Sequence, residues 1–115
     1  MSVKLTTRQV GDVTVIDASG RITLGEGSSA FRDMIRDLAS SGHKKLLLNL
    51  ADVSYIDSSG IGEMVSGFTT VTNHGGMLKL AMPNPLCREI LDVTGVSRRI
   101  EIFTDMTTAV GSFAR

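Results

Sequence analysis

The run Leu46-Leu47-Leu48-Asn49-Leu50 is the feature that most constrains the fold of this chain. It is short and almost uninterrupted in its apolar character, which is typical of a strand covered on more than one side. A chain of 115 residues has room for a single domain around such a strand. We therefore expect a central strand in one domain that spans residues 1–115.

Strand-like and helix-like segments alternate around this run. Alternating residues at 3–7 and a β-branched stretch at 13–18, separated by Gly11-Asp12, predict an opening antiparallel hairpin. Four later segments repeat apolar residues at helical spacing: 31–39, 61–71, 86–91 and 106–113. Two others have strand character: 77–82 and 100–103.

This order, β-β-α-β-α-β-α-β-α, predicts an α/β fold with a mixed sheet of about four to five strands and about four helices. The strands after the hairpin alternate with helices, so we expect them to run parallel. Phe68 lies on the apolar stripe of segment 61–71, and we expect its ring to be buried in the core.

Charge and cysteine content exclude several classes of protein. Lys plus Arg and Asp plus Glu number 12 each, so the chain has no basic excess for binding nucleic acid. The single cysteine forms no internal disulfide, which fits a reducing compartment. The N-terminus lacks an apolar signal segment, and no run reaches the roughly 18 apolar residues of a membrane span. We expect a cytoplasmic domain with no nucleic-acid or membrane partner.

The usual catalytic and metal-binding patterns are missing. A nucleophilic serine needs a base, and both histidines, His43 and His74, stand beside glycines in predicted turns. Cys87 lies among apolar residues of a short helix, which is typical of an inert buried thiol. The stretch Gly60-Ile61-Gly62 lacks the Lys-Ser/Thr pair of a phosphate-binding loop. We therefore expect no enzymatic activity, no metal and no cofactor.

The stretch Asp57-Ser58-Ser59-Gly60-Ile61-Gly62 stands at the start of a predicted helix. One interpretation is helix capping by Asp57 or a serine, which contributes about 1 kcal/mol. However, two glycines in a first helical turn cost about 1 kcal/mol each, so stability alone does not explain them. They leave the serine hydroxyls uncovered and allow another backbone to approach closely.

An accessible serine at a helix N-terminus suits an external kinase better than an internal catalytic base. Phosphate on Ser58 would bring a charge of about −1.5 to −2 to a position where the helix dipole favours anions. The fold should tolerate this charge, whereas a partner docked on the same surface would not. The stretch therefore predicts a site that switches binding.

At these residues the chain resembles the single-domain anti-sigma factor antagonists, which are built on the STAS domain. The resemblance covers nearly the whole chain, and its most specific part is the stretch that begins at Asp57. Other matching segments are Gly20-Arg21-Ile22, residues 46–50, residues 52–56, Gly75-Gly76 and residues 91–96. The resemblance implies a single STAS-like domain.

The resemblance also implies a function. The unphosphorylated antagonist binds an anti-sigma factor, which is a serine kinase with a histidine-kinase-like ATPase fold, and sigma factor is released. Phosphorylation on Ser58 ends this binding, and a PP2C-type phosphatase restores it. The kinase brings the ATP, so the antagonist needs no cofactor. The implied partner surface comprises Arg21, Thr23, Asp57, Ser58, Ser59, Gly60, Ile61 and Gly62.

The sequence leaves two points open. Many relatives carry an acidic residue shortly after the strand-ending glycine, in a G-x-L-D pattern, and this chain has Thr23 there, which bears on the identity of the partner. Similar STAS domains also serve as scaffold subunits of stressosome-like assemblies, which is the alternative function. We expect a monomer or a weak homodimer, because an exposed strand edge can pair.

Overall fold

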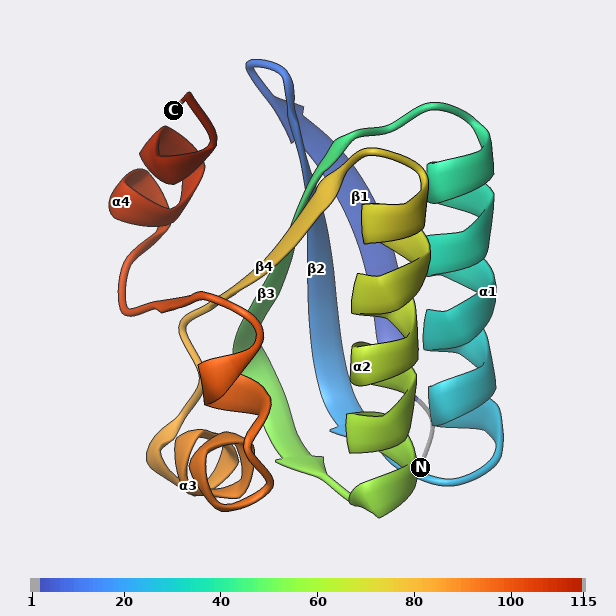
Figure 1. The fold of residues 1–115 in the computed structure, drawn as a ribbon. Helices are drawn as coiled ribbons and strands as arrows, with labels where there is room; N and C mark the ends of the chain where they lie inside the picture. Colours follow the sequence, from blue (N-terminus) through green and yellow to red (C-terminus); the bar gives the residue numbers. More distant parts are fainter. Residues whose placement is uncertain (1–2, 115) are drawn as a thin grey trace.

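The apolar run at 46–50 lies in β3 (Lys45–Ile56), the middle strand of a sheet with the order β1-β2-β3-β4-β5 (Figure 1). This is seen in a computed structural model of the chain, which describes residues 3–114. Leu46, Leu47, Leu48 and Leu50 are fully buried. The prediction of a central strand covered on both faces is confirmed.

The remaining elements follow in the predicted order and form one α/β domain. They are β1 (Lys4–Val10), β2 (Val13–Ile22), α1 (Glu26–Ser40), α2 (Ser58–Asn73), β4 (Met77–Ala81), α3 (Pro85–Val93), β5 (Ile102–Phe103) and α4 (Met106–Gly111), with short 3-10 turns at Val96–Arg98 and Ser112–Ala114. β1 pairs with β2 in antiparallel fashion. The pairs β2–β3, β3–β4 and β4–β5 are parallel, so the mixed sheet is confirmed.

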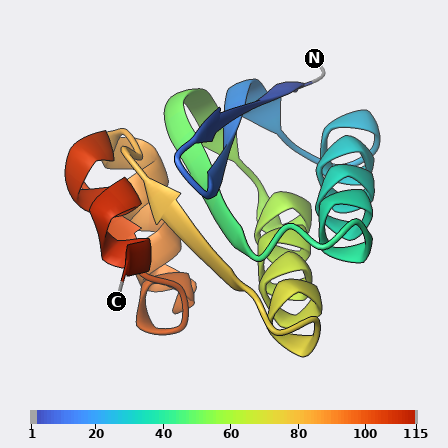
Figure 2. The same cartoon turned by 90° about the horizontal axis from the view of Figure 1, so that it is seen from above.

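Helices cover the two faces of the sheet unequally. Side chains alternate along β3, so Leu46, Leu48 and Leu50 face one side and Leu47 faces the other. The first three belong to a large core cluster that also contains buried residues of α1, α2 and α3. Leu47 belongs to a smaller cluster closed by Ala109 of α4 and by Phe113. Figures 1 and 2 show α1 and α2 side by side on one face and α4 on the other.

β3 is longer than the sequence pattern indicates, and its length positions the site. Its pairing with β4 ends at Asn49, opposite Ala81, but its pairing with β2 continues to Ile56, opposite Ile22. Two register shifts, one between Asp17 and Ser19 and one between Gly20 and Arg21 of β2, each place one extra residue in β3. The ends of β2 and β3 therefore project beyond β4 and carry the connections to α1 and α2.

The prediction that Phe68 is buried in the core is wrong. Its ring is only half-buried and packs against the edge of the large cluster. The buried position is the neighbouring Gly67, where a Cβ atom would lie 3.3 Å from the side chain of Ile35 on α1. The helical stripe through Ile61, Met64 and Val71 is buried as expected, and Phe68 lies at its border.

A pair of truncations tests this assignment of the core. Phe31 of α1 is fully buried, so Phe31→Ala should lower the free energy of unfolding by about 3–5 kcal/mol. Phe68→Ala leaves a partly solvated gap and should cost about 1–2 kcal/mol. Urea unfolding of both variants measures the difference. Equal losses would show that Phe68 is a core residue after all.

Candidate functional site

The predicted site residues meet at one edge of the sheet. Because the carboxyl ends of parallel strands lie at the same edge, the end of β2 and the end of β3 bring two loops together. Arg21 and Thr23 come from the end of β2 and the loop after it, and Asp57 follows β3 directly. The remaining predicted positions, 58–62, form the first turn of α2.

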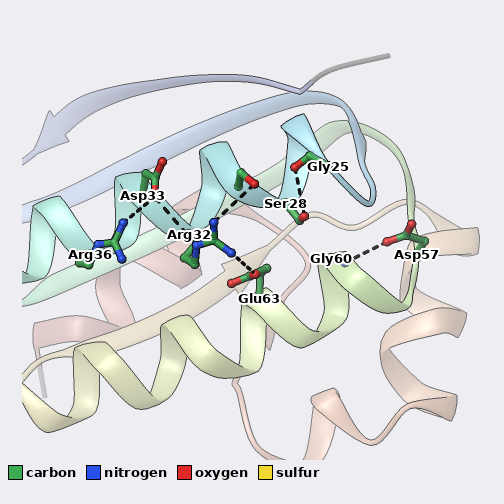
Figure 3. Close-up of polar contacts among 9 residues, drawn as sticks. Gly25, Ser28, Arg32, Asp33, Arg36, Asp57, Gly60 and Glu63 are labelled. Carbon is green, nitrogen blue, oxygen red and sulfur yellow. Dashed lines mark hydrogen bonds and ion pairs between the residues drawn. The ribbon is translucent and has the colours of Figure 1, made fainter.

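Asp57 is the N-cap of α2 (Figure 3), and it also joins the two loops. Its Oδ1 atom accepts a hydrogen bond from the backbone N–H of Gly60 at 2.9 Å. Its Oδ2 atom accepts another from the backbone N–H of Leu24 at 3.0 Å, and its own N–H donates to the carbonyl of Ile22 at 3.2 Å. The Gly60 bond, with smaller contributions from other N–H groups and Arg21, holds the pKa of Asp57 below its usual value against the effect of desolvation.

Gly60 allows α2 to begin directly against the end of β2. A Cβ atom on Gly60 would lie 2.4 Å from the carbonyl oxygen of Ile22 and 2.8 Å from the side chain of Ile56. The backbone that approaches closely is thus the chain's own. Gly60 and the neighbouring Ile61 are both buried, so they support the site from beneath.

Ser58 occupies the first helical position and its side chain is exposed. Sequence reasoning left open whether Asp57 or a serine caps the helix, and the structure assigns the cap to Asp57. The Ser58 hydroxyl therefore has no part in the cap. The N–H groups at the start of α2 and the helix dipole favour a negative charge at this position.

A shallow hollow of about 480 Å³ lies between the first turns of α1 and α2. Arg32 of α1 reaches across to Glu63 of α2 with an Nη1–Oε2 distance of 3.0 Å, and this ion pair lies in the lining (Figure 3). The lining also includes Ser59 and Gly62 from the predicted stretch. The two serines thus differ in setting, because Ser59 is half-buried at the hollow whereas Ser58 faces solvent.

Leu24 is a site residue that sequence reasoning missed. It lines the hollow, its backbone is bonded to Asp57, and its side chain is 77% exposed. The available signal was weak: one large apolar residue between Thr23 and Gly25, just before a predicted loop. Exposed single leucines are common, so only its neighbours in space draw attention to it.

Arg21 and Thr23 flank the same loop. The guanidinium of Arg21 lies 5.3 Å from the centroid of the Tyr55 ring, so the exposed cation is oriented by an aromatic face. The carbonyl of Thr23 accepts a hydrogen bond from the N–H of Ser28 at 2.9 Å, and Thr23 itself is half-buried. Arg21 therefore presents its side chain to solvent, whereas Thr23 contributes its backbone carbonyl to the hydrogen bonds of the loop.

Groups with other chemistry lie away from this edge. His43 and His74 precede β3 and β4, so they lie at the opposite edge of the sheet from Ser58. Cys87 is buried, and desolvation raises the pKa of its thiol. Within residues 3–114 no three His, Cys, Asp or Glu side chains form a group that could hold a metal ion. None of the helices in that range is long and apolar enough to span a membrane.

Comparison with known proteins gives consistent results. The family model described as STAS domain matches residues 4–109. The anti-sigma-B factor antagonist of Bacillus subtilis (strain 168) is 30% identical over 102 residues, which cover 89% of this chain and 92% of that protein. The crystal structure of a candidate anti-sigma factor antagonist of Thermotoga maritima is 25% identical, with a TM-score of 0.89 and coverage of 96% of this chain and 95% of that chain.

A third relative has been solved in a phosphorylated form. It is the Bacillus cell fate determinant SpoIIAA, with a TM-score of 0.73 and 19% identity, and the match covers 95% of this chain and 98% of that chain. At this level of identity the likeness shows a shared fold. Together with the family model, these matches agree with the sheet order and the single domain seen here.

The pH dependence of stability tests the role of the Asp57 carboxylate. Asp57→Asn keeps the size of the side chain but loses one acceptor and the charge, and should cost about 1–2 kcal/mol at pH 7. The folded-state pKa of Asp57 lies below its unfolded value of about 3.9. The stabilisation is therefore present above about pH 4 and is lost as the pH falls through the folded pKa. Urea unfolding at pH 7, 5 and 3.5 measures the difference in free energy of unfolding between wild type and Asp57→Asn. This difference should shrink only at pH 3.5. A difference that is the same at all three pH values would contradict the role given to the carboxylate.

Two glycine substitutions, two residues apart in the first turn of α2, test the close approach of α2 to β2. Gly60→Ala should destabilise the chain by about 1–3 kcal/mol, because the nearest atom is a backbone oxygen that cannot move freely. Gly62→Ala is the matched control, since nothing lies within 4 Å of its added Cβ atom. It should be neutral or stabilise by about 0.5–1 kcal/mol through helix propensity. Similar melting temperatures for the two variants would contradict the packing described here.

Proposed function

The chain belongs to the STAS domain family, and from this premise we propose that it is an anti-sigma factor antagonist whose binding is switched off by phosphorylation of Ser58. The unphosphorylated form binds an anti-sigma factor and thereby releases a sigma factor. The antagonist acts by binding and carries out no reaction itself. Similarity to anti-sigma factor antagonists along about nine-tenths of the chain supports this role.

The observation that carries the proposal is the division of tasks between Asp57 and Ser58. Asp57 accepts a hydrogen bond from a backbone N–H group in the first turn of α2, and it connects this turn to the β2–α1 loop. Ser58 is thereby left exposed at a helix N-terminus, where a phosphate is electrostatically tolerated. Modification can change the surface without removing a contact on which the fold depends. SpoIIAA, a relative with the same fold, has been solved in a phosphorylated form, which supports the proposal.

The partner is an anti-sigma factor that is also a serine kinase with a histidine-kinase-like ATPase fold. It binds ATP and transfers the γ-phosphoryl group to the Ser58 oxygen, and ADP leaves. A PP2C-type phosphatase hydrolyses the phosphoserine and restores the binding form. The chain needs no cofactor of its own in this cycle, and an ATP-dependent partner implies that it acts in the cytoplasm.

Exposure at the site supports the proposed partner surface. Ser58, Gly62 and Arg21 are exposed, and Asp57, Ser59 and Thr23 are half-buried beside them. Gly60 and Ile61 shape this surface from below. A phosphate on Ser58 places about two negative charges next to Asp57, so a partner fitted to the neutral serine meets unpaired charge and loses affinity.

Capture from a lysate of the source cells tests the proposal. Ser58→Ala removes the acceptor and should capture a kinase-like protein as well as wild type does, whereas Ser58→Asp should capture at least about tenfold less. Ser40→Asp is the matched control, since it adds the same charge at the end of α1, and it should bind normally. All four baits should unfold within about 1 kcal/mol of one another, because both positions are exposed and the helix-dipole effect of an added aspartate is of that size or smaller.

Two other results would contradict the proposal. Capture of the same kinase by Ser58→Asp and wild type would show that Ser58 is not the switch. The second is that every bait recovers STAS-bearing proteins and elutes at very high mass in size-exclusion chromatography. That result would favour the alternative function, a scaffold subunit of a stressosome-like assembly. The same column separates a monomer from the weak homodimer predicted from an exposed strand edge.

A further inference from the structure

We propose that Leu24 is the apolar anchor by which the partner recognises this chain, and that the partner offers an apolar recess for its side chain. The inference rests on the proposed function, because it takes the kinase of the Ser58 switch as the occupant. Leu24 is 77% exposed at the rim of the hollow that Ser59 and Gly62 also line. It therefore lies on the surface that a partner of Ser58 must contact.

The loop that carries Leu24 is held in place before any partner arrives. The Leu24 N–H donates to Asp57 Oδ2 at 3.0 Å. On either side of Leu24, the Thr23 carbonyl accepts from the N–H of Ser28 at 2.9 Å, and the Gly25 carbonyl accepts from the N–H of Ser29 at 3.0 Å. A side chain presented on a fixed backbone loses little conformational freedom on binding, which favours an anchor role.

Location distinguishes Leu24 from the other large apolar side chains that are exposed. Within residues 3–114 these are Leu24, Met77, Leu86 and Val93. Met77 begins β4 and so lies at the opposite edge of the sheet, and Leu86 and Val93 belong to α3. Among these four, Leu24 alone lines the hollow between α1 and α2.

The charges around Leu24 indicate what kind of partner fits. The Glu63 carboxylate is paired with Arg32 at 3.0 Å (Figure 3). The Asp57 carboxylate accepts hydrogen bonds from the backbone N–H groups of Gly60 and Leu24. The remaining polar lining of the hollow consists of serine hydroxyls, from Ser28, Ser29, Ser59 and Ser66. An apolar side chain among satisfied charges suits an uncharged, apolar recess on the partner.

The same geometry couples Leu24 to the switch. One carboxylate, that of Asp57, holds the Leu24 backbone and the first turn of α2, so Leu24 and Ser58 keep a fixed relation. Phosphate on Ser58 then brings unpaired charge to the border of the apolar contact. Dehydrating that charge disfavours the docked state, even though Leu24 itself does not move.

The experiment uses the kinase-like protein captured by Ser58→Ala, produced in pure form, and isothermal titration calorimetry. Leu24→Ala should weaken binding at least about tenfold, and Leu24→Glu more, whereas Leu24→Met should stay within about threefold of wild type. Met77→Ala is the matched control at the opposite edge and should change the affinity less than about twofold. Melting temperatures of the Leu24 variants should match that of wild type, because the Leu24 side chain packs against little of the fold.

Photo-leucine incorporated at position 24 or 77 gives a second readout that does not depend on affinity. Cross-linking to the kinase from position 24, and none from position 77, is the expected result. The anchor proposal would be overturned if the captured kinase bound Leu24→Ala as tightly as wild type and gave no cross-link from position 24. That result would not contradict the proposed Ser58 switch. Failure of Ser58→Ala to capture a kinase would overturn both proposals.

Discussion

The Asp57 carboxylate is the interaction on which the site depends. One oxygen caps α2 through the Gly60 N–H and the other fixes the β2–α1 loop through the Leu24 N–H. Two segments more than 30 residues apart in the chain are thereby held in one place. An acceptor engaged by two backbone donors is strongly preferred in its charged form, which is why its pKa is lowered.

Under the proposed function, this arrangement separates stability from regulation. The cap, the close approach at Gly60 and the long β2–β3 pair hold the edge of the sheet together without using the Ser58 hydroxyl. A chain in which Ser58 served as the cap would lose a stabilising contact each time the serine was modified. With Asp57 in that role, the exposed serine can change its charge while the fold beneath it stays the same.

Much of this could be predicted from the sequence, because burial leaves a periodic pattern. The apolar run at 46–50 predicted the central strand, and helical spacing predicted α1 and α2. Phe68 was misassigned because the spacing of apolar residues shows which face of a helix is buried but not where the buried face ends. The smaller Gly67 makes the close contact with α1. The length of β3 was missed because its end beyond β4 is exposed at Ala51 and Asp52, which breaks the apolar pattern. Leu24 was missed because its significance depends on a contact between distant segments.

The measurement that tests the account most directly is a comparison of amide NMR spectra with serine and with phosphoserine at position 58. The phosphoserine can be introduced during expression, so no kinase is needed. We expect shift changes confined to the β2–α1 loop and the first turn of α2, with the Gly60 and Leu24 amides still protected from exchange. Loss of that protection, or changes spread across the sheet, would show that phosphorylation acts by altering the fold rather than the surface.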